Sequence, residues 1–380
     1  MARTRSTRRL PVAALTAVAA VVAAVVAAGG GTAHAAPPAN DGWQVVATRL
    51  APEQEAIWDH ADATRPDDVW VAGVQDYDYE EASGTPAVGH WNGSSWRVYV
   101  FPVADDISNV TGLSAAAPDD VWVTYNEVAT KRIYHYDGTY WTRKVTRGSG
   151  RKFGDITAVP GHAWTLATDH SVATYNGQTW TSKKIIDSGT LDHLESRTSK
   201  DVWAYGNAVE APPGHVPTTY QPLAVHWNGK AWARTTMSSS VKDCAFTDLT
   251  AVGGKKAWAK CVGYDRKSET SWWDVLRWDG RTWRKVLGPV DGESGAGLTA
   301  NAAGEVWAGS AHALWHFDGR QWQHTPLPQP KDRQPVLDVA ARDLAAVPGS
   351  HQVVAAGSAY LDPGADGDYP PQFDVVWRRS

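Results

Sequence analysis

The sequence predicts an all-β fold, a seven-bladed β-propeller that is closed by pairing of its N- and C-terminal strands. Three observations lead to this prediction. A tryptophan-containing motif recurs along the chain, a second motif alternates with it, and each end of the chain supplies only part of a repeat. Repeats spaced by roughly 40 to 50 residues are typical of arrays built from one supersecondary unit. No segment shows sustained helical periodicity, so we expect almost no helix.

The first motif is an aromatic residue, then Asn or Asp, then Gly, with Trp three positions after the Gly. Its six copies span residues 91–96, 136–141, 175–180, 227–232, 278–283 and 317–322. Asn-Gly and Asp-Gly between apolar runs are a strong hairpin signal, because a tight turn needs a residue with positive φ. The Trp after each turn is predicted to pack between neighbouring units, as is Trp43 near the start of the chain.

The second motif reads Leu-x-Ala, a short turn, and then Val-Trp or Ala-Trp. Five copies begin at Leu113, Ile156, Leu194, Leu249 and Leu298. The first unit keeps only Asp67-Asp68-Val69-Trp70, and a degenerate last copy spans residues 344–357. Each unit is therefore predicted to form four antiparallel strands. Strand A is the Leu-x-Ala segment, strand B the Val-Trp segment, strand C ends at the aromatic residue before Asn/Asp-Gly, and strand D begins at the Trp after the turn. Four-stranded units repeated radially make a propeller.

The ends of the chain complete the seventh unit. Residues 41–46 read as a strand D without a preceding strand C, and residues 374–377 read as a strand C without a following strand D. Pairing of Trp43–Ala47 with Phe373–Trp377 would close the ring and remove open sheet edges. A β-solenoid would need shorter, more uniform repeats and capping units, which the sequence lacks.

The repeats carry a family resemblance. Asp-Val-Trp stands at 68–70, 120–122 and 201–203, and His-Trp-Asn-Gly-x-x-Trp at 90–96 and 226–232. In these motifs, residues 41–380 resemble secreted β-propeller proteins of high-GC Gram-positive, actinobacterial-type bacteria. The resemblance implies the fold and export but no particular activity. The repeats lack the WD40 pattern of Gly-His followed by a terminal Trp-Asp, the double glycine that follows strand B in kelch repeats, and sialidase Asp-boxes.

The first 35 residues have the layout of a secretory signal peptide. Arg3, Arg5, Arg8 and Arg9 precede an apolar run, which ends at Ala33-His34-Ala35. We expect cleavage after Ala35, a short disordered linker at 36–40 and one propeller over 41–380. A retained anchor fits the cleavage pattern less well, and the choice between Sec and twin-arginine export stays open.

The remaining chain is expected to be extracellular. No other apolar stretch reaches the length of a membrane span. Loss of the leader changes the formal net charge from −5 to −9, because it removes four arginines and no acid. Such an acidic surface argues against nucleic acid as a partner.

Cys244 and Cys261 are the two cysteines of the chain. In an exported protein, a pair within one repeat favours a disulfide. The alternative is two buried free thiols. Two cysteines alone do not make a zinc site.

The irregular B–C connections are the predicted binding region. In a propeller they lie on one face together with the D–A connections, and variable loops on a rigid scaffold usually carry binding. Trp272 and Trp273 could instead begin a strand C and serve packing. The predicted ligand-binding residues are Tyr77, Tyr79, Tyr264, Trp272, Trp273, Tyr360 and Asp362.

No cofactor or metal is expected. His90, His135, His226 and His316 precede the strand-C aromatic in four different units, so they are interpreted as features of the repeat. Asp362, Asp366 and Asp368 offer oxygen ligands for calcium, but their spacing does not match an EF-hand loop, so calcium is not expected there.

These features favour an exported, monomeric, non-catalytic propeller that binds a glycan or an extracellular protein, or serves as a scaffold. Two alternatives remain open. One is a polysaccharide-acting enzyme with carboxylates among Asp76, Asp78, Glu80 and Asp265. The other is a structural envelope protein without a ligand.

Overall fold

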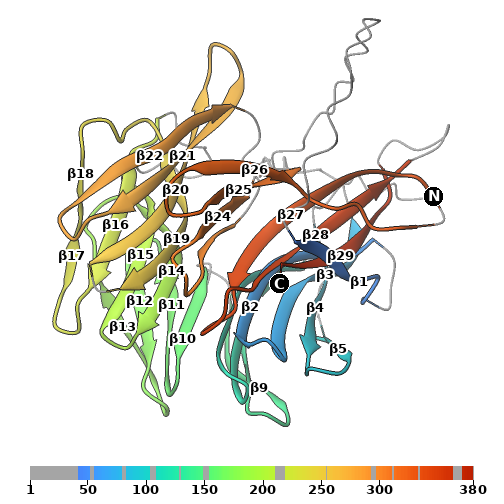
Figure 1. Cartoon of the computed structure of the whole chain (residues 1–380). Helices are drawn as coiled ribbons and strands as arrows, with labels where there is room; N and C mark the ends of the chain where they lie inside the picture. Colours follow the sequence, from blue (N-terminus) through green and yellow to red (C-terminus); the bar gives the residue numbers. More distant parts are fainter. Residues whose placement is uncertain are drawn as a thin grey trace, which may run out of the picture.

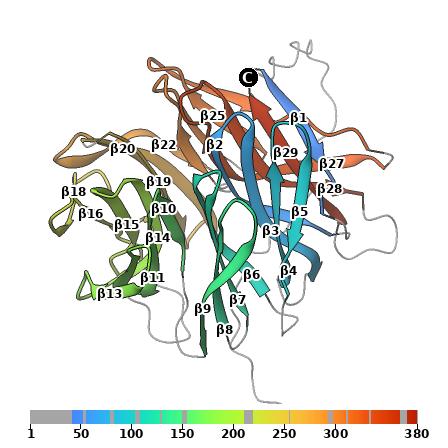
Figure 2. The same cartoon turned by 90° about the horizontal axis from the view of Figure 1, so that it is seen from below.

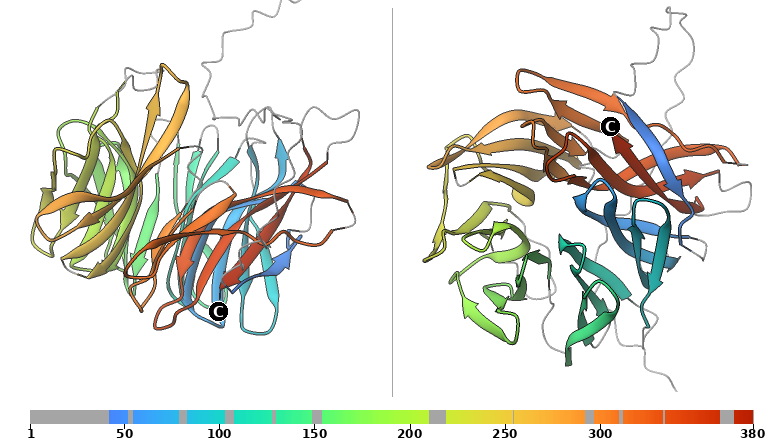
Figure 3. Two further views of the ribbon diagram at one scale, coloured as in Figure 1. Left: turned by 45° about the horizontal axis from the view of Figure 1, so that its top comes forward. Right: turned by 60° about the horizontal axis from the view of Figure 1, so that its bottom comes forward.

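The computed structural model describes residues 42–51, 55–78, 83–102, 108–127, 130–148, 154–209, 219–253, 255–291, 297–309, 312–332, 334–362 and 370–379. These residues form seven sheets arranged in a ring, so the predicted seven-bladed propeller is confirmed (Figure 3). The described residues contain no helix, as the absence of helical periodicity predicted.

Blades 1 to 4 each contain four antiparallel strands in sequence order from the axis outward. Blade 1 has β2 (Ile57–Arg65), β3 (Asp68–Asp78), β4 (Ser83–Trp91) and β5 (Trp96–Val100). Blade 2 has β6 (Ser108–Ala117), β7 (Asp120–Glu127), β8 (Thr130–Tyr136) and β9 (Trp141–Gly148). Blade 3 has β10 (Ile156–Val159), β11 (His162–Thr168), β12 (Ser171–Tyr175) and β13 (Trp180–Lys184). Blade 4 has β14 (Thr190–Thr198), β15 (Asp201–Asn207), β16 (Pro222–Trp227) and β17 (Trp232–Arg234).

Blade 5 differs from the predicted four strands. It has β19 (Ala245–Gly253), β20 (Lys256–Asp265), β21 (Thr270–Trp278) and β22 (Thr282–Asp291). A fifth short strand, β18 (Thr236–Met237), pairs in parallel with β22 at the outer edge. Blade 6 has β23 (Leu298–Ala300), β24 (Val306–Gly309), β25 (Ala313–Phe317) and β26 (Trp322–Pro326).

Blade 7 closes the ring with strands from both ends of the chain. It contains β27 (Val336–Ala346), β28 (Val353–Leu361), β29 (Gln372–Arg379) and β1 (Trp43–Thr48). Figure 2 shows the blue β1 alongside the red β29, and the two strands pair antiparallel with Trp43 opposite Arg379 and Thr48 opposite Val375. The predicted closure is confirmed, although β1 meets the end of β29 rather than its start. As a result, blades 1 and 7 lie side by side (Figure 1).

The repeated Asn/Asp-Gly motif forms the C–D turns. The glycines of all six turns have φ between +87° and +92°, which a residue with a side chain rarely adopts. In the first turn, Asn92 Oδ1 accepts hydrogen bonds from the backbone N–H groups of Ser94 and Ser95, both at 3.0 Å. The side-chain acceptor and the glycine explain why this dipeptide recurs.

The tryptophans after these turns pack between blades, as predicted. Five strand-D tryptophans meet the strand-B Trp of the preceding blade, and all five pairs are edge-to-face, the geometry that aromatic quadrupoles favour. Ring centroids are 6.0 Å apart for Trp141–Trp70, 5.8 Å for Trp180–Trp122, 5.6 Å for Trp283–Trp203, 6.4 Å for Trp322–Trp258 and 5.5 Å for Trp43–Trp307.

The four repeated histidines have structural partners within their own blades. In blade 1, Asp68 Oδ1 accepts hydrogen bonds from Trp70 Nε1 at 3.2 Å and His90 Nε2 at 2.7 Å, while the His90 ring stacks on Trp70 at 3.7 Å. Blades 2 and 4 repeat this arrangement, and in blade 6 His316 stacks on Trp307. The Asp-Val-Trp and His-Trp motifs therefore join strands B and C.

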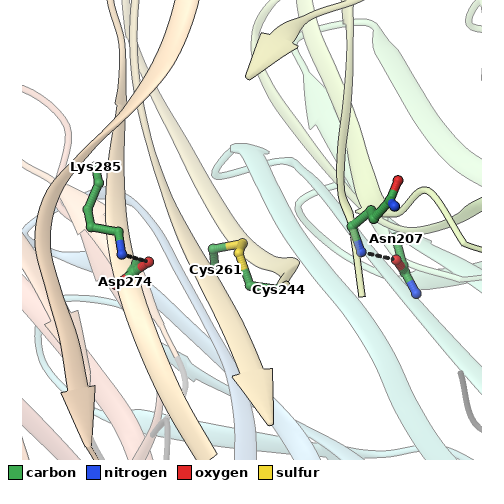
Figure 4. The surroundings of a disulfide bond; sticks show 6 residues. Asn207, Cys244, Cys261, Asp274 and Lys285 are labelled. Carbon is green, nitrogen blue, oxygen red and sulfur yellow. Dashed lines mark hydrogen bonds and ion pairs between the residues drawn. A yellow bond between two sulfur atoms is a disulfide. The ribbon is translucent and has the colours of Figure 1, made fainter. Parts of the chain in front are cut away.

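The predicted disulfide is confirmed. Cys244 and Cys261 are bonded with a Cα–Cα distance of 5.5 Å, next to the paired strands β19 and β20 (Figure 4). The two arms of the hairpin differ in length, and two β-bulges in β19 absorb part of this difference. On the adjacent strands, Lys285 Nζ forms an ion pair with the buried Asp274 at 2.7 Å (Figure 4).

Candidate functional site

The B–C and D–A connections share one face of the ring, here called the loop face. The C–D turns lie on the opposite face, called the turn face. The β20–β21 hairpin stands out from the loop face (Figure 3), and Tyr264 on it is 46% exposed. At the base of the blade 4 connection, buried Asn207 joins the loop ends, since its Oδ1 accepts from the N–H groups of Val209 and Gln221.

The adjacent tryptophans of β21 differ in environment. Trp273 is fully buried and meets Trp315 edge-to-face at 6.3 Å, while Lys260 Nζ lies 4.8 Å from the ring centre. Trp273 is therefore a packing residue between blades 5 and 6, the alternative left open above, and burial removes it from the predicted binding surface. Trp272 is half-buried against Gly263, where a Cβ atom would meet the indole.

Two of the predicted tyrosines come together at the seam between blades 1 and 7. Arg342 Nη2 donates a hydrogen bond to the Tyr360 hydroxyl at 3.2 Å, and Arg342 Nη1 lies 3.4 Å from Asp59 Oδ1. Tyr77 experiences the charges of both Arg342 and Asp59, and burial raises the pKa of its phenol. We call Asp59, Tyr77, Arg342 and Tyr360 the rim cluster.

Among the other predicted residues, Asp78 adds its charge to the surroundings of Tyr77 in the rim cluster. Asp76, Asp78, Asp265 and Asp362 are exposed. Asp265 Oδ1 accepts a hydrogen bond from the N–H of Lys267 within its own turn. The predictions for Tyr79, Glu80, Asp366 and Asp368, and the signal peptide and linker, lie outside the described residues.

A channel of about 660 Å³ runs along the propeller axis and is lined mainly by strand A of all seven blades. Asp59 and Arg342 of the rim cluster also line it, so the cluster lies at its loop-face mouth. β-Bulges at equivalent places in strands β2, β6, β14, β19 and β27 precede the residues that face the axis. A bulge re-aims the side chains of an edge strand, which explains how polar residues point into the channel.

The channel side chains form a belt of hydrogen bonds from each blade to the next. Asp62 accepts from the N–H of Ala115 at 2.7 Å, Asp155 from Leu194 at 3.0 Å, and Asp343 from Ala61 at 2.9 Å. The Ser114 hydroxyl accepts from the N–H of Ala158, and the Thr299 hydroxyl accepts from the N–H of Ala346. Glu195 accepts from the backbone of Ala251, and Asp248 accepts from the backbone of Gly297. Together these bonds cross all seven junctions between blades.

Five of these acceptors, here called the channel carboxyls, are Asp62, Asp155, Glu195, Asp248 and Asp343. Removal from bulk water and mutual repulsion favour their neutral forms. Burial raises the pKa of Asp62 to about 6, of Asp155 to about 7 and of Glu195 to about 8. Burial also raises the pKa of Asp248, against the opposing charge of Lys260, and the pKa of Asp343. The channel therefore takes up protons near neutral pH.

Sequence reasoning missed these acids because it treated the Leu-x-Ala repeat as purely structural. The signal was nevertheless present. The position before the Leu holds Asp155, Asp248 and Asp343 in three blades and His60, Gly112, His193 and Gly297 in the others. The position after it holds Asp62 and Glu195 in two blades and Ser114, Thr157, Thr250, Thr299 and Ala345 in the others. A strand position whose polar residue changes from blade to blade contrasts with the constant apolar residue beside it. Among the described residues, no group of three or more His, Cys, Asp and Glu side chains is placed to hold a metal ion.

Known proteins share the fold of this chain. No protein-family profile and no curated protein matches the sequence. A structure of YCF48 bound to D1 peptide matches with 14% identity and a TM-score of 0.57, over 89% of this chain and 96% of that one. Streptogramin B lyase matches with 10% identity and a TM-score of 0.54, over 88% of this chain and 97% of that one.

The extracellular domain of the putative one component system BT4673 from B. thetaiotaomicron matches with 10% identity and a TM-score of 0.53, over 88% of this chain and 40% of that one. In the part of the chain that the structure describes, no helix has the length and apolar character needed to cross a membrane. At these identities, the chain shares with these proteins the β-propeller fold.

Proposed function

We propose that this chain is an exported binding or scaffold propeller that recognises a glycan or an extracellular protein segment on its loop face. The observation that carries the proposal is the rim cluster. Tyr77 and Tyr360 come from opposite ends of the chain, yet both lie beside the Arg342–Asp59 pair at the channel mouth.

The chemistry of the rim cluster suits such ligands. Phenol rings provide flat apolar surfaces that stack on sugar rings, and Tyr and Arg are enriched among residues that anchor protein interfaces. The side chains of Arg342 and Asp59 are 34% and 33% exposed, so both retain contact with solvent on the loop face. The structure of YCF48 with a bound peptide supports a polypeptide as one of the two ligand classes.

The proposal is tested by screening the purified mature protein against glycan arrays, cell-wall fractions and extracellular proteins. Tyr77→Phe and Tyr360→Phe keep the rings but remove the hydroxyls, whereas the double change to Ala removes the stacking surfaces as well. We expect the double Ala variant to lose about 1–3 kcal/mol of binding free energy, as anchor residues do.

Tyr140→Ala is the matched control, because Tyr140 is 71% exposed but lies in a C–D turn on the turn face. Thermal melts show whether each variant is folded. Unchanged binding by the folded double variant, or an equal loss in the control, would show that the rim cluster is not the binding site.

A polysaccharide-acting enzyme is the second candidate, and one observation favours it. With a pKa raised to about 8, Glu195 is protonated at neutral pH, as a general acid must be. Glycoside hydrolysis also needs a second carboxylate within about 5–10 Å. Release of reducing ends by the wild type, and its loss in Glu195→Gln with binding retained, would support the enzyme.

A further inference from the structure

One channel residue takes no part in the hydrogen-bond belt. Tyr205 on β15 is 5% exposed, and it is the one strand-B residue among the described positions that lines the channel. Its hydroxyl makes no hydrogen bond with the part of the chain that the structure describes. The equivalent residues of the other blades, read from the strand register, are Ala72, Thr124, Leu166, Lys260, Gly309 and Ala356. The repeat itself therefore does not require a tyrosine here.

The surroundings of Tyr205 are strongly acidic. Its pKa is raised well above the usual value, first by burial and then by the charges of Asp248, Asp155, Glu195 and Asp343. The ring of His193 stacks on that of Tyr205 at 5.4 Å, and burial lowers the pKa of His193 to about 4, so this imidazole is neutral at pH 7. Among the residues that the structure describes, six carboxyl groups and one guanidinium group line the channel.

We propose that the channel binds an organic ammonium ligand, a primary amine or a polyamine, whose N–H groups are shared by the Tyr205 hydroxyl and the carboxylates of Asp155 and Glu195. This inference goes beyond the proposed function and does not depend on it. Each carboxylate accepts a backbone N–H in the belt, but two oxygens offer about four acceptor sites, so acceptors remain for a ligand.

The geometry favours an ammonium group over a bare metal ion. A metal requires several ligand atoms that converge at short distance, and no such group of acids and histidines is found in the described structure. An ammonium group has three separate donors, so it can use acceptors spread around a wall. A neutral polyol would gain nothing from the acidic lining. The volume of about 660 Å³ lies within the range of small-molecule sites.

The test uses spermidine, with octanediol as an uncharged chain and calcium chloride as a cation without N–H donors. Titration calorimetry on the mature protein is run near neutral pH and at physiological ionic strength. We expect saturable spermidine binding with a raised Tm and no octanediol binding. We also expect net proton release, seen by comparing buffers of different ionisation enthalpy, because the ammonium favours ionised carboxyls.

Tyr205→Phe removes only the hydroxyl and should weaken spermidine binding about tenfold or more, as expected for a hydrogen bond to a charged group. Asp155→Asn and Glu195→Gln keep an acceptor for the belt but cannot ionise when the ammonium group binds, and they should weaken binding at least as much. Tyr140→Phe is the control and should leave the affinity unchanged. Calcium that binds as tightly and displaces spermidine would overturn the assignment to an amine. Absence of spermidine binding, or full affinity in folded Tyr205→Phe, would overturn the site.

Discussion

Asp374 offers a sharp test of how the ring is closed. Its carboxylate is 1% exposed and accepts three hydrogen bonds across the seam between blades 7 and 1. The donors are the N–H groups of Leu50 and Ala51, at 2.8 Å and 3.3 Å, and Trp58 Nε1 at 3.0 Å. Asp374→Ala leaves all three donors without this acceptor.

The magnitude follows from these contacts. Each donor left unsatisfied in a buried site costs about 1–3 kcal/mol. Part of this loss is offset, because burial disfavours the charged carboxylate and raises the pKa of Asp374. We expect Asp374→Ala to lower the free energy of unfolding by about 3–5 kcal/mol. Asp374→Asn keeps an acceptor oxygen and should lose about 1–2 kcal/mol.

Urea unfolding followed by tryptophan fluorescence measures both changes. Asp279→Ala is the control, since Asp279 also accepts backbone hydrogen bonds, from Arg281 and Thr282, but its side chain is 43% exposed. Water can replace the lost acceptor there, so the control should lose less than about 1 kcal/mol. If Asp374→Ala lowered the free energy of unfolding no more than the control does, the hydrogen bonds accepted by Asp374 would not stabilise the junction between blades 7 and 1.

Four further predictions follow from the structure. Replacing Cys244 and Cys261 with Ser should cost about 3 kcal/mol for a loop of 17 residues, seen as a lower urea midpoint; an unchanged midpoint would contradict it. Trp273→Ala should cost about 3–5 kcal/mol because the indole is fully buried, and a loss below about 1 kcal/mol in the same assay would return it to the binding surface. The channel carboxyls have raised pKa values in the folded state, so their contribution to stability is complete below about pH 4 and is lost as pH rises toward 8, the value for Glu195. Thermal melts should therefore show a falling Tm over that window and a smaller fall in Glu195→Gln; a Tm that rises with pH would contradict this. N-terminal sequencing of the secreted protein should begin at Ala36, and an intact leader on the mature protein would refute the cleavage site.

The sequence indicates the tyrosines of the rim cluster but not the residues that they contact. The variable loops drew attention to Tyr77 and Tyr360, because irregular insertions stand out against a regular repeat; their role in binding stays a prediction. Their common partner Arg342 could not be predicted, since it lies within a strand-A repeat that carries no insertion. Trp273 shows the opposite case. The alternation of a strand buries one of two adjacent tryptophans, and the sequence does not say which.

The amino-acid sequence alone determined the repeat, the C–D turns, the disulfide and the closure of the ring. These features depend on local chemistry, such as the positive φ of a glycine after Asn or Asp, or on how many strands each end supplies. Only the tertiary structure decided which side chains face the axis of the propeller. In five blades a bulge in strand A turns polar residues inward, and closure of the ring brings acids from five blades into one channel. The raised pKa values of these acids and their hydrogen bonds to the next blade depend on neighbours that are distant in sequence. Short sequence patterns therefore do not predict them.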